Sequence, residues 1–296
     1  IWKEAGWGSI VYLATMAGIP QDQYEAADID GATRIQKIKK LHKKIVVVLS
    51  CGSAIEMPFI DDVDAILHCY LNGQAGALAT LNLLSGKVNP SGKLSETIPL
   101  KLEDVASSDN FPSHTRTIEY REAYGIGYRY FDTAHVRVAF PFGFGLSYTT
   151  FEYSDLAVSP NGVTFNIKNT GKREGKEVAQ LYVGLRGSEV MRPEKELKGF
   201  SKVSLKPGET KQVTIPFDDK TFRYFNVKTN KWEIEKGIYD IYVGSSSRDL
   251  LLQGTIEQAG TGAEAPYDKT LMPNYFIGNL RNIPDEEFAA LLGHEI

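Results

Sequence analysis

The stretch Gly86-Lys-Val-Asn-Pro-Ser-Gly-Lys-Leu-Ser-Glu-Thr-Ile-Pro99 closes an α/β segment of the chain. It follows Gly76–Ser85, which is rich in Ala and Leu and whose apolar spacing predicts a helix. Gly86 stands where a glycine commonly ends a helix. The residues Asn89–Gly92 then have the composition of a turn that leads into an extended segment.

Two apolar runs precede this helix. Ile45–Leu49 is a continuous run dominated by valine, which predicts a parallel strand covered on both faces. Asp64–Leu71 is a second run of the same kind. Together with the helix they form β-α-β material with a right-handed crossover, although the segment is too small for a complete doubly wound sheet.

The chain from Thr149 to about Ile256 has an all-β pattern. Short runs rich in Val, Ile, Tyr and Phe are separated by turn residues, and about seven strands in this length are typical of an Ig-like sandwich. The predicted strands are Val163–Ile167, Val178–Val183, Lys198–Leu205, Gln212–Phe217, Phe222–Val227, Lys231–Ile234 and Ile238–Val243.

Composition restricts the function classes. The chain has 296 residues, and its net charge of −4 excludes only a strongly basic surface for nucleic acid. Cys51 and Cys69 lie in apolar segments, which favours buried free thiols over a disulfide. No secretory signal is recognisable, and we expect a cytoplasmic protein. Because the sequence starts at Ile1 without an initiator Met, we expect a truncated chain.

The α/β segment resembles the C-terminal domain of glycoside hydrolase family 3, whose members include β-glucosidases and β-xylosidases. The pieces that carry the resemblance are the loop Gly86–Pro99 together with Val46-Val-Val-Leu-Ser50, Met57-Pro-Phe-Ile60, Asp64-Ala-Ile-Leu67 and Gly73-Gln-Ala-Gly76. Two later motifs, Tyr120-Arg-Glu-Ala123 and Phe142-Gly-Phe-Gly-Leu-Ser-Tyr148, are also similar to the family. This chain has Ala123 where the family usually has Gly, and Phe144 where His is common.

The all-β segment is similar to the fibronectin type III-like domain that ends many enzymes of this family. The matching pieces are Asn169-Thr-Gly171, Gly175-Lys-Glu-Val178, Gln180-Leu-Tyr-Val183, Arg192-Pro-Glu-Lys-Glu-Leu-Lys-Gly-Phe200 and Leu205-Lys-Pro-Gly-Glu209. The predicted fold class is therefore α+β with several domains: a partial α/β unit with a parallel sheet, followed by an Ig-like or fibronectin III-like β-sandwich. We expect a helical segment at 1–44, the partial α/β domain at 45–100, an aromatic arm at 101–148, the sandwich at 149–256, and a linker with a C-terminal helix at 257–296.

The resemblance implies a chemistry that this chain does not hold. Retaining glycoside hydrolysis needs two carboxyl groups about 5–5.5 Å apart. In the family, the nucleophilic Asp lies on an N-terminal (β/α)₈ barrel, and the acid/base Glu of many members lies in a loop before the strand matched by Ile45–Leu49. Glu56, Glu96 and Glu122 match no catalytic motif, although Glu122 lies in a loop that approaches the cleft in the family. We therefore predict no catalytic residue here.

No cofactor or metal site is predicted either. The five histidines show no spacing typical of metal ligands; they are His42, His68, His114, His135 and His294. The partners implied by the resemblance are the missing barrel domain and, in the intact enzyme, a β-linked oligosaccharide or glucoside. Neither nucleic acid nor a membrane-spanning segment is expected.

The first part of the chain resembles a different family. Glu25-Ala-Ala27 and Gly31, after an apolar run that ends at Pro20, are similar to the cytoplasmic coupling loop of sugar ABC-transporter permeases. On this interpretation residues 1–34 are permease-like, and two unrelated sequences join near Ile35–Lys44. An ordinary amphipathic helical hairpin is the alternative.

Three functions thus remain open from the sequence. The first is the C-terminal portion of a family 3 glycoside hydrolase, similar to a β-glucosidase and inactive alone. The second is a carbohydrate-binding or structural β-sandwich module, for which Tyr224 and Trp232 would supply sugar-stacking rings if both were exposed together. The third, which rests only on the first forty residues, is a fragment of a sugar ABC-transporter permease.

Overall fold

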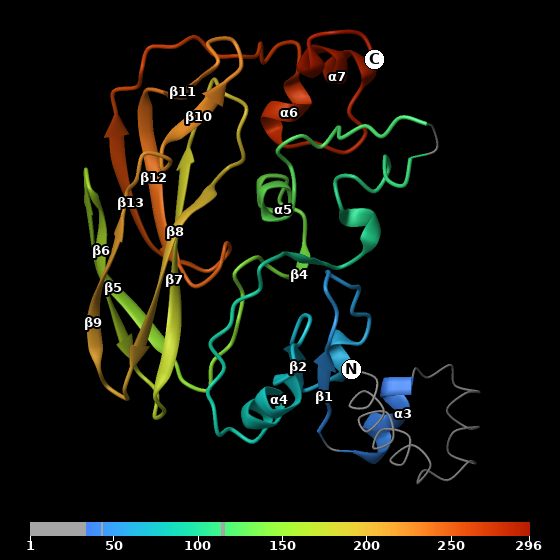
Figure 1. The fold of residues 1–296 in the computed structure, drawn as a ribbon, viewed down its shortest axis with the longest axis vertical. Coiled ribbons are helices and arrows are strands. Elements are labelled where there is room, and N and C mark those ends of the chain that lie inside the picture. Colours follow the sequence, from blue (N-terminus) through green and yellow to red (C-terminus); the bar gives the residue numbers. More distant parts are fainter. Residues whose placement is uncertain (1–33, 43, 114–115) are drawn as a thin grey trace. The chain divides into compact units, whose positions relative to one another are not determined.

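The computed structural model describes residues 34–42, 44–113 and 116–296, which form two compact units (Figure 1). The first unit holds the described residues up to 53 together with 57–87; the second holds 54–56 and 88–296. The permease-like segment predicted at 1–34 lies, apart from its last residue, outside the described residues. Among the helices that are described, none is long and apolar enough to cross a membrane.

The first unit contains the predicted strands and helix. Its elements are α3 (Arg34–Leu41), β1 (Val46–Leu49), the 3₁₀ turn η1 (Ile60–Asp62), β2 (Ala65–His68) and α4 (Gly76–Leu84). Strands β1 and β2 pair in parallel, with Val46 opposite Ala65. The prediction of a strand covered on both faces was wrong, since Val46 and Val48 are 48% and 42% exposed. Exposed and half-buried residues alternate along β1, so Val46 and Val48 share the more exposed face of this two-stranded sheet.

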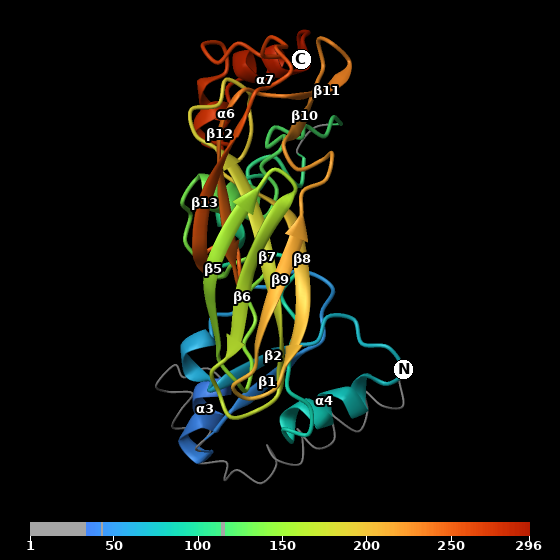
Figure 2. The same ribbon diagram turned by 90° about the vertical axis from the view of Figure 1, so that its left-hand side faces the viewer.

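The second unit is built around a β-sandwich of the predicted kind. One sheet has the strand order β13-β12-β7-β8 and the other β5-β6-β9, while β10 and β11 form a separate hairpin. Figure 2 shows the three-stranded sheet in front of the four-stranded one. The strands are β5 (Phe151–Ser159), β6 (Gly162–Asn169), β7 (Gly175–Leu185), β8 (Glu196–Leu205), β9 (Thr210–Pro216), β10 (Arg223–Asn226), β11 (Lys231–Ile234), β12 (Gly237–Gly244) and β13 (Leu250–Gln258).

The core of the sandwich is apolar and closed. Phe165, Leu181 and Ile241 come from both sheets, and each is at most 1% exposed. Strand β7 alternates its side chains between this core and the opposite face, where the arm lies. The sequence predicted seven of these nine strands and missed two edge strands, β5 and β13.

The arm and the C-terminal segment form a second core beside the sandwich. Their elements are β3 (Ile98–Pro99), the 3₁₀ turn η2 (Leu102–Asp104), α5 (Tyr128–Thr133), β4 (Val138–Phe140), α6 (Pro273–Ile277) and α7 (Asp285–Leu292). Tyr130, Phe131, Tyr275 and Phe288 are buried together in it. The predicted C-terminal helix is α7, in which Pro284 takes the N-cap position and Asp285 is the first helical residue. Gly293 ends the helix in the left-handed conformation.

Candidate functional site

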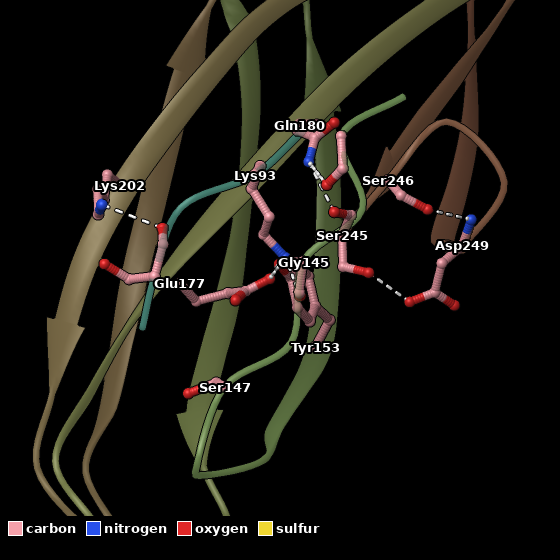
Figure 3. A network of polar contacts seen from close by, with 12 residues as sticks. Lys93, Gly145, Ser147, Tyr153, Glu177, Gln180, Lys202, Ser245, Ser246 and Asp249 are labelled. Carbon is pink, nitrogen blue, oxygen red and sulfur yellow. Dashed lines mark hydrogen bonds and ion pairs between the residues drawn. The ribbon is translucent and has the colours of Figure 1, made fainter. Parts of the chain in front are cut away.

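The two motif segments that carry the family resemblance lie side by side. Leu94 N donates to Phe144 O at 2.8 Å, and Gly143 N donates to Leu94 O at 2.8 Å. Strands β3 and β4 continue this pairing, with Ile98 opposite Phe140. The loop that ends the α/β segment and the aromatic arm therefore form one irregular ribbon. We call the place where this ribbon meets the sandwich the junction; its residues are 88–95, 140–148 and their partners on β5, β7 and the loop after β12 (Figure 3).

The two glycines of the Phe-Gly-Phe-Gly motif are required by close approach. A Cβ atom on Gly145 would lie 2.3 Å from Gly92 O, and one on Gly143 would lie 2.0 Å from Gln180 Oε1. Gly143 also has a φ of +78°, which L-residues rarely adopt. The two glycines of this motif are therefore needed because the arm approaches both the loop and strand β7 closely.

Asn89, in the turn of the opening stretch, links three chain segments. Its Oδ1 accepts from Ser147 Oγ at 3.0 Å and from Tyr148 N at 2.8 Å. Its Nδ2 donates to Glu174 O at 3.0 Å, just before β7. Asn89, which has the sequence context of an ordinary turn residue, therefore joins the loop, the arm and the sandwich.

A charged group lies at the centre of the junction. Lys93 Nζ is 3.1 Å from Glu177 Oε1, and it also donates to Gly145 O at 3.3 Å. Tyr153 OH donates to the same oxygen of Glu177 at 3.0 Å, and the Glu177 carboxylate is 5% exposed (Figure 3). Burial, and after it the negative charge of Glu177, raises the pKa of Tyr153. The tyrosine therefore remains a neutral donor to the carboxylate.

Gln180 fixes the other end of the junction. Its Nε2 donates to Gly143 O at 3.1 Å and to Ser245 O at 2.6 Å, while its Oε1 accepts from Tyr182 OH at 2.6 Å. Ser247 N donates to Phe142 O at 2.9 Å. Each polar atom of the buried glutamine side chain thus has a partner, as buried amides require.

A second ionic cluster holds α5 to the sandwich. Asp132 is 5% exposed, and its Oδ1 accepts from Arg248 Nε at 2.7 Å. Lys195 Nζ, itself 6% exposed, is 3.4 Å from the other oxygen. Arg248 also donates to Phe131 O at 2.9 Å and Val136 O at 2.8 Å, which places the guanidinium across the end of the helix.

The aromatic residues of the arm pack against the sandwich and against each other. Tyr128 stacks on Phe142 with ring centroids 4.6 Å apart and meets Tyr182 edge-on at 6.0 Å. Its hydroxyl accepts from Leu197 N at 2.9 Å. These rings attach the arm to the sandwich rather than form an open sugar-stacking surface.

The three glutamates considered from the sequence have different surroundings. Glu56 Oε1 accepts from Leu102 N at 2.6 Å, and Glu96 Oε2 accepts from Ala54 N at 3.1 Å. Both therefore act as acceptors for backbone amides. Glu122 is 8% exposed, and its Oε2 has no hydrogen-bond partner. Each of the three carboxyl groups therefore has its own surroundings.

The rings considered for carbohydrate binding do not form a shared surface. In the β10–β11 hairpin Tyr224 is opposite Glu233, whereas Phe225 is opposite Trp232, so Tyr224 and Trp232 point to opposite faces. Trp232 is 56% exposed but lies under the guanidinium of Arg223, 4.4 Å from its Cζ. The condition that both rings be exposed together is not met.

The sequence did not single out the polar residues of the junction. Lys93 and Glu177 are 84 positions apart, and Asp132 and Arg248 are 116 positions apart, so no local spacing connects either pair. One signal was present: Gln180 interrupts the apolar pattern of β7, and a polar residue in such a strand needs a buried partner.

Comparison with known families supports two matches within the chain. Residues 10–148 match the glycosyl hydrolase family 3 C-terminal domain, and residues 177–247 match the fibronectin type III-like domain. The first match begins at residue 10 and so includes most of the segment compared above with a permease, and the permease resemblance finds no support in it. The strands β5 and β6, which complete the sandwich, lie before the second match.

Individual relatives agree with these matches. Thermostable beta-glucosidase B of Acetivibrio thermocellus is 45% identical over 276 residues, which cover 88% of this chain and 36% of the relative. An exo-alpha-(1->6)-L-arabinopyranosidase of Bifidobacterium longum is 40% identical, with 87% of this chain and 35% of the relative covered. The chain thus spans about a third of the length of these curated relatives.

Solved structures of beta-glucosidases are also similar to this chain. The Bifidobacterium adolescentis GH3 beta-glucosidase superposes with a TM-score of 0.74 at 37% identity and covers 86% of this chain and 37% of its own. Beta-glucosidase 3B from Thermotoga neapolitana, solved with glucose, gives 0.69 at 39% identity, covering 75% and 32% of the two chains. With its sandwich, its arm and both domain matches, the chain belongs to glycoside hydrolase family 3 and carries the C-terminal domain of that family followed by its fibronectin type III-like domain.

Proposed function

We propose that this chain forms the C-terminal part of a β-glucosidase-like enzyme that hydrolyses terminal β-linked sugars with retention of configuration. The observation that carries the proposal is the 45% identity to Thermostable beta-glucosidase B across 88% of this chain. The two ionic clusters give this part a physical role, because they hold the arm and its loop in one fixed position against the sandwich. On this proposal the arm walls an active site whose reacting groups lie elsewhere.

The chain itself supplies no catalytic residue on this proposal. Acid/base assistance contributes roughly 10²–10⁴-fold, and the covalent route of retaining enzymes needs a nucleophile as well. Glu56 and Glu96 are engaged by backbone amides, and Glu122 is enclosed. We therefore propose that a (β/α)₈ barrel domain is the essential partner and that no cofactor or metal takes part.

The test compares the chain alone with a completed enzyme. The purified chain should release no nitrophenol from aryl β-glucoside or β-xyloside, and a Glu122→Gln variant serves as the contamination control. A chimera in which residues 45–296 replace the matching third of Thermostable beta-glucosidase B should be active. Activity of the chain alone that disappears in Glu122→Gln would instead make Glu122 catalytic and overturn the proposal.

The choice of sugar and the cellular location belong to the same proposal. Because the relatives include both beta-glucosidases and an arabinopyranosidase, the chimera should be assayed with aryl β-glucoside and aryl α-L-arabinopyranoside side by side. We propose glucoside as the preferred substrate. We also propose a cytoplasmic location, in line with the free thiols of Cys51 and Cys69. Alkylation of both thiols in intact cells, followed by cell fractionation, tests this location.

A further inference from the structure

The chain contains two Asn-Gly pairs, and their surroundings differ. Asn72-Gly73 lies in the loop between β2 and α4, and both of its residues are exposed. Asn161 lies in the turn between β5 and β6, and Gly162 is the buried first residue of β6. In an Asn-Gly pair the backbone nitrogen can approach the preceding side-chain amide closely, because glycine has no Cβ to obstruct it. The two pairs therefore have the same chemistry but different freedom to react.

The backbone nitrogen of Gly73 is free to move. Among the described residues Gly73 N donates no hydrogen bond, whereas Gly73 O accepts from Gly76 N at 3.0 Å. A Cβ atom built on Gly73 would meet no heavy atom within 4 Å beyond its chain neighbours. The nitrogen can therefore lose its proton and turn toward the Asn72 side chain without breaking a hydrogen bond or displacing a packed group.

The Asn72 side chain lies against the first residue of α4. A Cβ atom on Gly76 would lie 2.4 Å from Asn72 Cβ and 2.8 Å from Asn72 Cγ. Because the first N–H groups of a helix have no carbonyl partner within it, this end of α4 carries a partial positive charge. That charge favours the negative oxygen that develops on Cγ when a nucleophile attacks it, and also a carboxylate in place of the amide.

The sandwich holds the second pair in place. Gly162 pairs with Ser159 on β5 and with Pro216 on β9, so its backbone belongs to two strand ladders. A Cβ atom on Gly162 would lie 2.5 Å from Ile215 O, which shows how closely β9 approaches. Attack on the Asn161 side chain would have to pull the glycine nitrogen out of this sheet. The fold therefore resists at the second pair a reaction that it permits at the first.

We propose that Asn72-Gly73 is a site of spontaneous deamidation, from which Asn161-Gly162 is protected by the fold. Hydroxide takes the proton of Gly73 N, the nitrogen attacks Asn72 Cγ, and the amide group leaves as ammonia with a proton from water, which closes a succinimide ring. Water then opens the ring: cleavage of the Cγ–N bond gives aspartate, and cleavage of the original peptide C–N bond gives isoaspartate. Either product adds a negative charge before α4. This modification is independent of the proposed function.

The first test incubates the purified chain in mildly alkaline buffer and maps its peptides by mass spectrometry. The peptide with Asn72 should gain the mass that separates a carboxylate from an amide, and its isoaspartate should accept methyl groups from a protein-isoaspartate methyltransferase. The peptide with Asn161 should convert more slowly by about an order of magnitude or more, whereas both should convert at comparable rates in the guanidinium-unfolded chain. Folding that slows Asn72 as strongly as Asn161, or faster conversion of Asn161 in the folded chain, overturns the proposal.

The second test changes the glycine alone. Gly73→Ala should slow the conversion of Asn72 by about an order of magnitude, because the added methyl group obstructs the approach of the nitrogen. The space beside Gly73 is open, so this variant should keep the melting temperature of the unmodified chain. Asn72→Asp supplies the product standard, with which part of the incubated chain should co-elute on ion exchange. Conversion of Asn72 in Gly73→Ala at the rate of the unmodified chain would exclude attack by the backbone nitrogen and overturn the proposal.

Discussion

The sandwich and the first unit bury apolar side chains to very different extents. In the sandwich Leu181 and Ile241 are fully buried between two sheets, whose seven strands enclose the core. In the first unit the apolar residues Val46, Leu78 and Leu81 are 48%, 63% and 63% exposed. Because burial of apolar surface is the main stabilising contribution, we expect the sandwich to be more stable than the first unit. Hydrophobic pattern predicts which segments form strands and helices, whereas closure of a core decides which of them are stable.

The largest expected effect is on protection from proteolysis and hydrogen exchange. Limited proteolysis should leave a stable fragment near residues 149–258, while the first unit is cut early, because backbone opening is easy where few side chains are buried. Amide exchange in β6 and β7 should be slower than in β1 and β2 by orders of magnitude. Digestion of the sandwich before residues 46–99 would show that the difference in burial does not translate into stability.

The next effect concerns charge at the boundary of the sandwich. Asp132→Asn should lower the free energy of unfolding by about 3–5 kcal/mol, because Lys195 remains buried and Arg248 loses its ionic partner. Urea unfolding followed by tryptophan fluorescence measures it.

An exposed ion pair gives the control. Asp219→Asn breaks the contact with Arg223 at a carboxylate that is 71% exposed, and it should change stability by less than about 1 kcal/mol. Equal losses in the two variants would mean that the Asp132 cluster is no more stabilising than a surface pair.

A matched pair of leucines tests the comparison most directly. Leu181→Ala should cost about 2–5 kcal/mol, since it opens a cavity in the closed core of the sandwich. Leu81→Ala on α4 should cost about 0.5 kcal/mol or less, because that side chain is 63% exposed and leaves no cavity. A large loss at Leu81 would show that its side chain is covered in solution. The chain alone and the chimera can be compared in the same assay.

The sequence predicted strands where side chains alternate regularly and missed those where they do not. Strand β5 contains a register shift between Ser154 and Ala157, and Asp155 there has a φ of 58°. That bulge breaks the alternation by which β5 would have been recognised. Strand β13 alternates, but it mixes Gln253, Gly254 and Thr255 into its middle and so looks like a loop.

The candidate site was less predictable than the fold. Family motifs pointed to the loop at 86–99 and to the arm, but they did not indicate that Asn89 joins the two to the sandwich. The contacts that matter connect residues far apart in sequence, and such pairs leave no periodic pattern. Gln180 could have indicated a buried polar contact, since it stands within an apolar strand.

The smallest effect is a pH dependence that originates in the second core. Burial raises the pKa of Tyr124 to about 12, and its hydroxyl donates to Tyr275 O at 2.7 Å. The unfolded chain loses this proton near pH 10, whereas the folded chain retains it until about pH 12. The stabilising contribution is therefore complete below pH 10 and is lost as the pH rises from there toward 12, at up to about 1.4 kcal/mol per pH unit.

Other buried tyrosines also have raised pKa values, which change the stability with pH in the same direction. A substitution at Tyr124 isolates the contribution of this one residue. Tyr124→Phe should lower the free energy of unfolding at pH 8 by about 1 kcal/mol, through the lost hydrogen bond, and should also make its decline between pH 10 and 11 less steep. Tyr120→Phe, at a side chain that is 70% exposed, should leave both quantities unchanged. If the decline above pH 10 is as steep in Tyr124→Phe as in the unmodified chain, Tyr124 is accessible to hydroxide in the folded state. The second core would then be as open as the first unit, and closure would distinguish only the sandwich from the rest of the chain.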